Sequence, residues 1–418
     1  MPAEPVSPPV VVQDDTSGRT ARRIVAVLAI AAVLPALYQK GWHDFFDLKI
    51  YMATMDWWVT GNPLYDYAQP DQLQGELRFT YPPFGALLLS PFALLQLGVT
   101  AMIFTVLTVL AVVVTTRWLV DPVIARHHLP RIFTLTVAAL LVLAMESTRE
   151  TISFGQINML LVVLILADLL FAVPQDRRWA GVGVGLATAL KLYPGIFIVY
   201  LLAGRQWRAA AVASATAAGA TLLAGALLPL ESWRYWTHEL WATDRVGRTD
   251  YTGNQSLLGL IHRLTVPQEP DQLLWLALVA VVAGYGLWRA ARAARAGDAL
   301  AGLTLTGLVG ALISPITWPH HIYWFVPAAV VLVDAALAAR TGGRRCWLWL
   351  LAAGVAVITV YGVVTFQDWG TAPVPTDTVA DFVERNVYVL LGLALLASLP
   401  IRSKAIQPDT LHEVPTGR

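Results

Sequence analysis

Two adjacent histidines, His320 and His321, stand at the boundary between two hydrophobic runs of the sequence. Imidazoles at such a boundary need hydrogen-bond partners or water, because burying them unpaired is costly. Pro315 and Pro319 break the helix there, which is tolerated at membrane depth where the freed backbone lines a cavity. We therefore interpret this stretch as one wall of an active site.

The histidine pair has three interpretations. It can donate hydrogen bonds or charge to a departing phosphate, on which negative charge develops. A zinc site is less favoured, because adjacent histidines seldom face one metal ion and no carboxylate or cysteine lies at ligand spacing. The third interpretation is structural, with both imidazoles at a helix end and satisfied by backbone and water.

Asp47 is the candidate catalytic carboxylate. Around it, Phe46, Ile50, Ala53 and Trp57 fall at helical spacing, which predicts a helix lying along the membrane surface. A carboxylate held at that surface can take a proton from a hydroxyl group as the hydroxyl attacks. The alternative is that Asp47 caps this helix.

Two cations lie near membrane segments. Lys191 belongs to an otherwise apolar segment that Pro194 interrupts. A lysine in such a place pairs with an anion or extends its amine to the membrane surface. Arg149 has the same two interpretations, and the neighbouring Glu146 and Glu150 offer it an ordinary ion pair. Both cations are candidates for binding a lipid phosphate.

Four amides are candidates for hydrogen bonds to a sugar. Gln156 and Asn158 begin one hydrophobic run, and Asn254 and Gln255 end a loop rich in tryptophan. Amides at the start of a membrane helix also join helices to one another, and Asn254 is equally suited to cap the segment that follows it. The sequence leaves these alternatives open.

The elements that position these residues are membrane helices. Of the 418 residues 56% are hydrophobic and only 14% are charged, against about 25% in soluble proteins, and the mean hydropathy is +0.58. We therefore predict an all-α polytopic membrane protein. The net charge of +1 gives no indication of nucleic-acid binding, and the single cysteine, Cys346, permits neither an internal disulfide nor a thiolate zinc site.

We predict about 10–12 transmembrane or re-entrant helices, with interfacial helices in the extracytoplasmic loops. Ten apolar runs are candidate crossings: 24–39, 99–116, 132–146, 157–173, 209–229, 272–288, 299–315, 322–339, 346–366 and 386–401. Two further apolar segments, 82–97 and 180–203, are interrupted by proline. We expect these two to be re-entrant or half-membrane helices.

The runs define one membrane domain. We expect a disordered cytoplasmic tail over 1–21, a single transmembrane domain over 22–403 with long extracytoplasmic loops at 40–80 and 230–271, and a second disordered tail over 404–418. The start of the chain carries no cleavable signal pattern, so we expect its first run to be retained as an anchor.

The distribution of positive charge orients the domain. The segments at one end of the predicted helices carry nineteen lysines and arginines, and those at the other end carry nine. By the positive-inside rule the richer end is cytoplasmic. The other end carries the two long loops, so we expect the chemistry to face the periplasm.

Six short blocks follow one another along the chain: Phe46-Asp47-Leu48-Lys49-Ile50-Tyr51, Phe79-Thr80-Tyr81-Pro82-Pro83, Gly155-Gln156-Ile157-Asn158, Lys191-Leu192-Tyr193-Pro194, Asn254-Gln255-Ser256 and Ser314-Pro315-Ile316-Thr317-Trp318-Pro319-His320-His321. Together they resemble glycosyltransferase family 87, the actinobacterial polyprenol-phosphate-mannose-dependent α-(1→2)-mannosyltransferases. Within that family the chain most resembles the enzymes that elongate phosphatidylinositol mannosides.

The resemblance implies a C-type glycosyltransferase fold in the plasma membrane, with a site open to the periplasm. It implies that Asp47 is the catalytic base. It also implies that the histidine pair, Lys191 and the Asn254-Gln255 pair line one cavity, and it adds Tyr81 to the groups expected to bind sugar or acceptor.

The function expected from the resemblance is inverting mannosyl transfer from polyprenyl-phosphate-mannose to a phosphatidylinositol mannoside or a related lipoglycan. We expect no cofactor, because the lipid-linked sugar is itself the activated substrate. We also expect no obligatory metal, because the acidic pair that would hold one is not evident and basic side chains can neutralise the phosphate. Membrane lipids are the only other partners expected, with no nucleic acid and no protein partner implied. The alternatives are transfer of arabinofuranose from a similar donor and transport of a lipid-linked sugar.

Overall fold

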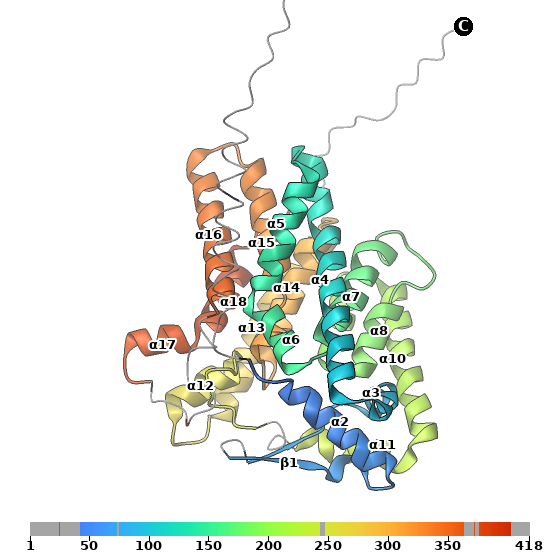
Figure 1. Ribbon diagram of the computed structural model, residues 1–418. Coiled ribbons are helices and arrows are strands. Elements are labelled where there is room, and N and C mark those ends of the chain that lie inside the picture. The colour runs from blue at the N-terminus through green and yellow to red at the C-terminus, as the bar shows by residue number, and fades with distance from the viewer. Residues whose placement is uncertain are drawn as a thin grey trace, which may run out of the picture.

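Helices make up nearly all of the structure, and they form a bundle with a smaller outer layer at one end (Figure 1). The structure is a computed structural model that describes residues 25, 42–72, 75–242, 247–362, 372 and 376–402. The tails predicted at 1–21 and 404–418 lie outside these residues, as does the run at 24–39 apart from residue 25. The predicted all-α membrane architecture is confirmed.

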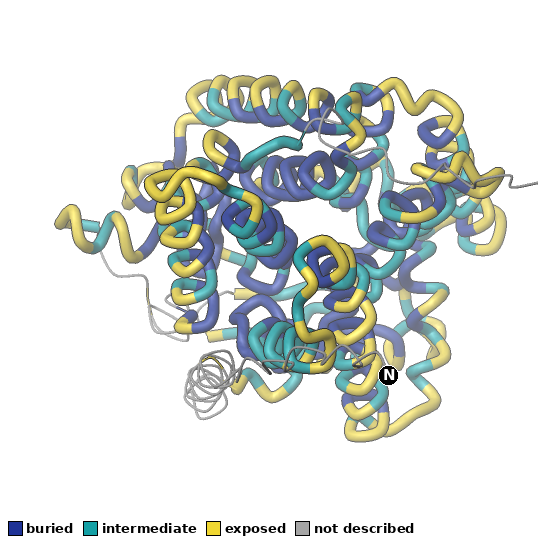
Figure 2. The backbone as a smooth tube through the Cα atoms, turned by 90° about the horizontal axis from the view of Figure 1, so that it is seen from above, coloured by how far each residue is buried: buried dark blue, intermediate teal, exposed yellow. Residues whose placement is uncertain are grey.

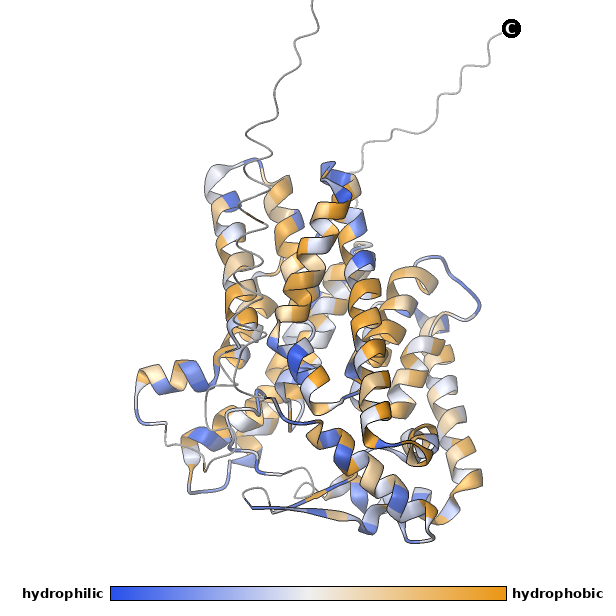
Figure 3. Ribbon diagram, in the orientation of Figure 1, coloured by the Kyte–Doolittle hydropathy of each residue, from blue (hydrophilic) through white to orange (hydrophobic). Residues whose placement is uncertain are grey.

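Four helices in the described part of the chain are each long and apolar enough to cross a membrane: α4 (Leu97–His127), α10 (Trp207–Leu227), α13 (Gln272–Arg295) and α16 (Gly342–Tyr361). A fifth crossing is possible if α5 (Arg131–Ala144) and α6 (Glu146–Phe154) count as one span, although they meet at an angle of 59°. Hydrophobic residues predominate along the helices of the bundle (Figure 3), and its outermost helices are exposed where its inner ones are buried (Figure 2). The protein is therefore a multi-pass membrane protein.

The other predicted runs contain shorter helices: α7 (Asn158–Ala167), α14 (Ala299–Ile313), α15 (Phe325–Ala338) and α18 (Val387–Ser398). These helices are too short to count as crossings on length alone. Among the described residues, the helices long enough to cross a membrane are therefore fewer than the apolar runs predicted. Several of them end where proline or glycine interrupts the run. Pro315, for example, disfavours the helical conformation at Ser314, where α14 stops.

The segment 180–203 is broken as predicted. It forms α8 (Val182–Leu190) and α9 (Ile196–Ala203), separated by an extended residue, Lys191, with φ −151° and ψ 127°. The segment 82–97 is likewise divided, into α3 (Pro83–Leu89) and a 3₁₀ turn over Ser90–Leu94. Both breaks face the outer layer of the molecule.

The outer layer consists of α2 (Phe46–Val59), α11 (Pro229–Thr237), α12 (Leu257–Thr265), α17 (Val379–Arg385) and an antiparallel hairpin of β1 (Ala68–Asp71) and β2 (Gly75–Arg78). The hairpin was not predicted. These elements gather at the lower end of the bundle in Figure 1. The two long predicted loops therefore meet at one end of the molecule.

The helix predicted around Asp47 is confirmed as α2. Of its predicted apolar face, Ile50 is buried and Trp57 is exposed. Further residues of the helix are buried in an apolar cluster beneath it: Leu48, Tyr51 and Met55. This cluster also contains Tyr65 from the outer layer. The buried face of α2 therefore packs against protein, and this packing fixes the direction in which Asp47 points.

Gly155 ends α6 and packs against Leu48 of α2. Its φ of 69° lies in the left-handed region that favours glycine, and a Cβ atom here would lie 2.6 Å from the Cβ atom of Leu48. Gly155→Ala should therefore lower the free energy of unfolding by about 2–4 kcal/mol, from backbone strain and overpacking together. Thermal unfolding of the detergent-purified protein, followed by tryptophan fluorescence, measures the change.

Gly219→Ala is the matched control for this substitution, because nothing lies within 4 Å of the position of its Cβ atom in α10. It should leave the melting temperature unchanged or raise it slightly. Equal melting temperatures for Gly155→Ala and the wild type would contradict the packing described here.

Candidate active site

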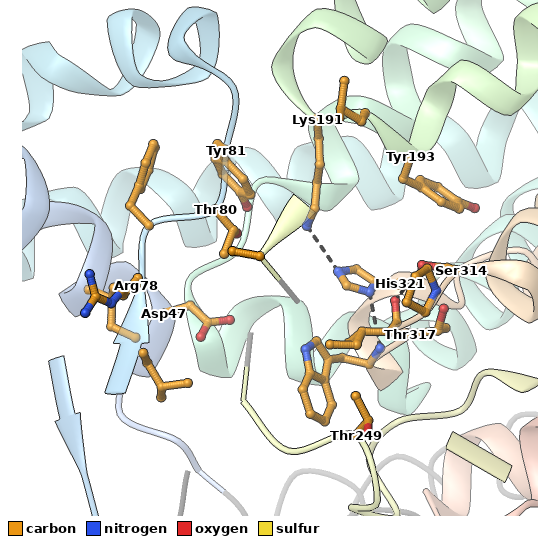
Figure 4. Close-up of a pocket in the computed structure, with 18 of the residues that line it drawn as sticks. Asp47, Arg78, Thr80, Tyr81, Lys191, Tyr193, Thr249, Ser314, Thr317 and His321 are labelled. Carbon is orange, nitrogen blue, oxygen red and sulfur yellow. Dashed lines mark hydrogen bonds between the residues drawn. The ribbon is translucent and has the colours of Figure 1, made fainter. Parts of the chain in front are cut away.

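A cavity of about 770 Å³ lies between the bundle and the outer layer. Six of the ten residues predicted to form the site line it: Asp47, Tyr81, Gln156, Lys191, His320 and His321. Asp47 lies on one side of this space, and Lys191 and His321 lie on the other (Figure 4). The carboxylate and the histidine pair, which are more than 270 residues apart in the sequence, therefore share one cavity.

Asp47 lies in the first turn of α2, where the N-cap position belongs to Phe45. Its Oδ2 atom accepts a hydrogen bond from Nε2 of Gln156. Burial raises the pKa of the Asp47 carboxyl from its ordinary value of 3.8 to about 6, although the Gln156 hydrogen bond and the charges of Lys191 and His43 act in the opposite direction. A carboxylate with this pKa can accept a proton near neutral pH.

Gln156 is fixed by two tyrosines as well as by Asp47. Its Nε2 atom donates to the hydroxyl of Tyr51 at 2.8 Å, and its Oε1 atom accepts from the hydroxyl of Tyr81 at 2.9 Å. The two tyrosine hydroxyls lie 3.0 Å apart. This network sets the orientation of the amide, so Gln156 presents an N–H group to the carboxylate.

Lys191 occupies the break between α8 and α9, which directs its side chain into the cavity (Figure 4). Its Nζ atom lies 3.2 Å from Oδ1 of Asn158, 3.1 Å from Nε2 of His321 and 5.0 Å from the centre of the Tyr81 ring. Pro194, three residues later, prevents the chain from continuing as one helix. The break thus brings a lysine to the wall of the cavity.

His321 belongs to a short 3₁₀ turn, Pro319–His321, that follows α14. The backbone N–H of Trp318 donates to its Nδ1 atom at 3.2 Å, so in the neutral imidazole the proton is on Nε2. The Nε2–H group and the Lys191 ammonium are both donors, and they meet at 3.1 Å. Two converging donors of this kind are suited to hold an anion between them.

His320 is placed differently from its neighbour. Both of its ring nitrogens are withdrawn from solvent and have no hydrogen-bond partner in the part of the chain described here. Its ring packs against Phe154, with centroids 5.3 Å apart, and edge-on against His321 at 4.5 Å. The structure thus separates the two histidines, with His321 offering a polar atom to the cavity and His320 packing behind it.

Asn158 and Asn254 do not line the cavity, so the direct sugar contacts predicted for them are not seen. Asn158 accepts from Lys191 and donates to the carbonyl of His320 at 3.1 Å. Asn254 accepts from the N–H of Thr317 at 2.9 Å and donates to the carbonyl of Pro315 at 3.1 Å. Both amides are occupied in holding the segment that carries the histidines.

Gln255 is also outside the cavity wall. Its Nε2 atom donates to the carbonyl oxygens of Thr252, at 2.6 Å, and Arg385, at 2.8 Å. Its own backbone N–H donates to the carbonyl of Thr317 at 2.7 Å. The predicted sugar contact is therefore replaced by a link between the histidine segment and the end of α17.

Arg149 points away from the cavity. It lies on α6, and its Nη1 atom donates to the carbonyl of Val360 near the end of α16 at 3.1 Å. The charges of Glu146 and Glu150 act on it as well. Arg149 therefore fits the alternative interpretation, an ordinary pairing with the neighbouring glutamates, better than it fits the predicted contact with a phosphate.

Some cavity residues were not predicted from the sequence. Arg78 and Leu77 reach the cavity from the hairpin, Thr249 from the loop before α12, and His43 from the segment before α2. Of these, Arg78 and His43 lie close in sequence to two of the six blocks that carry the family resemblance, those that begin at Phe79 and Phe46. This proximity could have identified both residues as candidates. Among the described residues no group of three His, Cys, Asp or Glu side chains is arranged to hold a metal ion.

Comparison with known proteins relates this chain to one family of glycosyltransferases. A profile of glycosyltransferase family 87 matches residues 79–315. A polyprenol-phosphate-mannose-dependent alpha-(1-2)-phosphatidylinositol mannoside mannosyltransferase of Mycobacterium tuberculosis is 33% identical, over 76% of this chain and 78% of its own. The corresponding phosphatidylinositol pentamannoside mannosyltransferase of Mycolicibacterium smegmatis is 32% identical, over 82% and 83%.

Two other proteins are more distant. An alpha-(1->3)-arabinofuranosyltransferase of Mycobacterium tuberculosis is 28% identical, over 77% of this chain and 72% of its own. The crystal structure of ArnT from Cupriavidus metallidurans, bound to undecaprenyl phosphate, aligns with 91% of this chain and 77% of its own, at 16% identity and a TM-score of 0.35.

Asn254→Ala should loosen the histidine segment, because it leaves the N–H of Thr317 without its partner and removes one of the two hydrogen bonds to the carbonyl of Pro315. Each buried group left unsatisfied costs about 1–3 kcal/mol. Hydrogen exchange over residues 314–321 should therefore quicken, and the melting temperature should fall. Asn62→Ala is the control, because Asn62 is only partly buried and its amide bonds stay within its own loop. Unchanged exchange at 314–321 would exclude the positioning role of Asn254.

Proposed function

Because the chain belongs to glycosyltransferase family 87, we propose that it is an inverting α-(1→2)-mannosyltransferase that takes mannose from a polyprenyl phosphate donor. The acceptor is a phosphatidylinositol mannoside or a related lipoglycan. One observation carries the proposal, namely a carboxylate and two converging hydrogen-bond donors on opposite sides of one cavity.

Asp47 is the catalytic base in this proposal. It removes the proton from the 2-hydroxyl of a mannose on the acceptor, and that oxygen attacks the anomeric carbon of the donor. The bond between this carbon and the phosphate oxygen breaks, and the phosphate leaves with the electron pair. Attack from the side opposite the phosphate converts a β-linked donor into an α-(1→2) product.

Lys191 and His321 bind the donor phosphate. An anion that enters between them accepts a hydrogen bond from the ammonium and another from Nε2–H, which removes the contact between the two donors. These interactions strengthen as negative charge builds on the departing oxygen, so they stabilise the transition state more than the bound substrate. His320 supports the ring of His321 by packing.

Gln156 and Tyr81 set the base side of the cavity. Their hydrogen bonds hold the carboxylate in one orientation, and both side chains line the space where a sugar must lie. The other predicted amides act indirectly, by positioning the backbone and side chains that line the cavity. They are Asn158, Asn254 and Gln255.

The cavity faces the periplasm and the protein lies in the plasma membrane. Helix α4, with 31 residues, is about 46 Å long, and it begins beside the outer layer that holds the cavity. Its far end carries Arg126 and His127, which contact Asp334 together with Arg402. This basic end corresponds to the cytoplasmic side by the positive-inside rule.

Mannose is favoured over arabinofuranose as the transferred sugar, because the mannosyltransferases are more similar to this chain than the arabinofuranosyltransferase is. Purified protein supplied separately with each polyprenyl phosphate sugar distinguishes the two. Transport of a lipid-linked sugar, by contrast, forms no glycosidic bond.

Asp47→Asn should reduce mannosyl transfer by about 10²–10⁴-fold, the range for losing a general base. The substitution keeps the size of the side chain, so the melting temperature should stay close to that of the wild type. The rate is measured as the transfer of labelled mannose from the donor to the acceptor lipid. Asp44→Asn, at an exposed carboxylate paired with Lys49, is the control and should retain activity. Full activity in Asp47→Asn would remove Asp47 from the mechanism.

The rate should depend on the protonation of Asp47. Burial raises the pKa of this carboxyl to about 6, so the base is ionised above pH 6 and is lost as the pH falls below it. We expect kcat/KM for the donor to fall about tenfold per pH unit below this midpoint, because kcat/KM reports the pKa of the free enzyme and the donor is a phosphodiester that does not titrate in this range. A rate profile that stays flat from pH 7 to pH 5 would contradict the assignment. The residual rate of Asp47→Asn should lack this decline.

A further inference from the structure

The chain takes an uncommon conformation immediately before α2. Asp44 and Phe45 both have positive φ values, 50° and 55°. An aspartate tolerates the left-handed region, but a bulky residue such as phenylalanine is a genuine outlier there. Two such residues in succession persist only where the surrounding structure holds them.

The end of α6 supplies that restraint through one residue. The backbone N–H of Phe45 donates to the carbonyl of Ser153 at 2.8 Å, and the backbone N–H of His43 donates to its Oγ atom at 2.6 Å. Ser153 is buried on α6, one residue before the helix ends. The strained turn is therefore fastened to the bundle by its backbone.

The side chain of His43 adds two further contacts with α6. Its Nε2 atom lies 3.0 Å from Oε2 of Glu150, and its ring stacks on Phe154, with centroids 4.3 Å apart and planes at 23°. Glu150 is buried, with 5% of its surface exposed, and His43 itself lines the cavity. A buried carboxylate next to an imidazole is a specific pairing, because a charge left alone at this position is costly.

We propose that His43 and Glu150 form a positioning pair, which holds the left-handed turn of Asp44 and Phe45 and so directs the Asp47 carboxylate into the cavity. The inference rests on the proposed function, since it assigns a means of placing the proposed base. His43 and Glu150 act through Asp47, and neither takes part in the transfer itself.

The pair also acts on Asp47 through its charges. The positive charge of His43 lowers the pKa of Asp47, and the negative charge of Glu150 raises it. The other groups that act on Asp47 are Gln156 from the start of α7 and Lys191 from the break after α8, and both lower the pKa. The two members of the pair therefore have opposite effects on the base.

The first experiment compares His43→Gln, His43→Ala and Glu150→Gln in the purified full-length protein. His43→Ala should lower kcat by about 10²-fold, the loss caused by displacing a reacting group by about 1 Å, with little change in KM for the donor. His43→Gln should lose less, because its amide can still donate to Glu150. The acid limb of kcat/KM should move to higher pH in His43→Gln and to lower pH in Glu150→Gln. A purely structural role does not predict opposite shifts.

A second experiment tests the strained turn itself. Phe45→Gly, added to His43→Ala, lets the backbone take the left-handed conformation without strain, so several-fold activity should return and the melting temperature should rise. Phe45→Ala, added to the same variant, is the matched control, because it removes the same ring without relaxing the turn. This control should recover nothing.

The inference is overturned if His43→Ala and Glu150→Gln keep the kcat and acid limb of the wild type, or if Phe45→Gly recovers no more than Phe45→Ala. The proposed function itself would be contradicted by a different result: a wild-type protein that is folded but forms no glycosidic bond to mannose. In that case the melting temperatures of the same variants still decide whether the pair holds the turn.

Discussion

Two amide side chains, Gln156 and Asn158, are separated by one residue in the sequence, and they join the two walls of the cavity. Gln156 donates to Asp47 on the wall formed by α2, and Asn158 binds Lys191 and the carbonyl of His320 on the opposite wall. In a bundle with little water an unsatisfied amide is costly, so each is held in place by its partners. The geometry of the site depends on this pair.

The break in the chain between α6 and α7 makes this arrangement possible. Gly155 ends α6 in the left-handed conformation, and α7 begins at Asn158. The same break places Ser153 and Phe154 against the segment before α2. Two similar breaks, at Lys191 and at Pro315, bring Lys191 and the histidine segment to the same end of the bundle. Interrupted helices thus let polar side chains meet at the edge of an apolar domain.

Much of this architecture could be predicted from the sequence, for physical reasons. Apolar runs and proline breaks are local signals, so the membrane helices and the breaks at Lys191 and Pro315 were predicted, as was the cavity position of Tyr81. The roles of Asn254 and Gln255 could not be predicted in this way. Their partners are backbone atoms of Thr317, Pro315 and Arg385, some 60 to 130 residues away, and backbone atoms leave no mark in a sequence.

Other features depend on conformation and so were missed. His43 looks like an ordinary loop histidine until the left-handed turn and the Glu150 contact are seen. The hairpin was missed because β1 contains Pro70 and neither strand alternates clearly between apolar and polar residues. The cluster that Leu48, Tyr51 and Met55 form beneath α2 was not predicted, because apolar residues lie on more than one side of that helix and tertiary packing selects among them.

The most direct test of the account is a structure of the Asp47→Asn protein with an acceptor mannoside and a phosphonate analogue of the mannosyl donor. The account predicts that the phosphonate lies between Lys191 and His321, and that the acceptor 2-hydroxyl lies between residue 47 and the anomeric carbon. A phosphonate bound elsewhere, or an acceptor hydroxyl out of reach of residue 47, would contradict it.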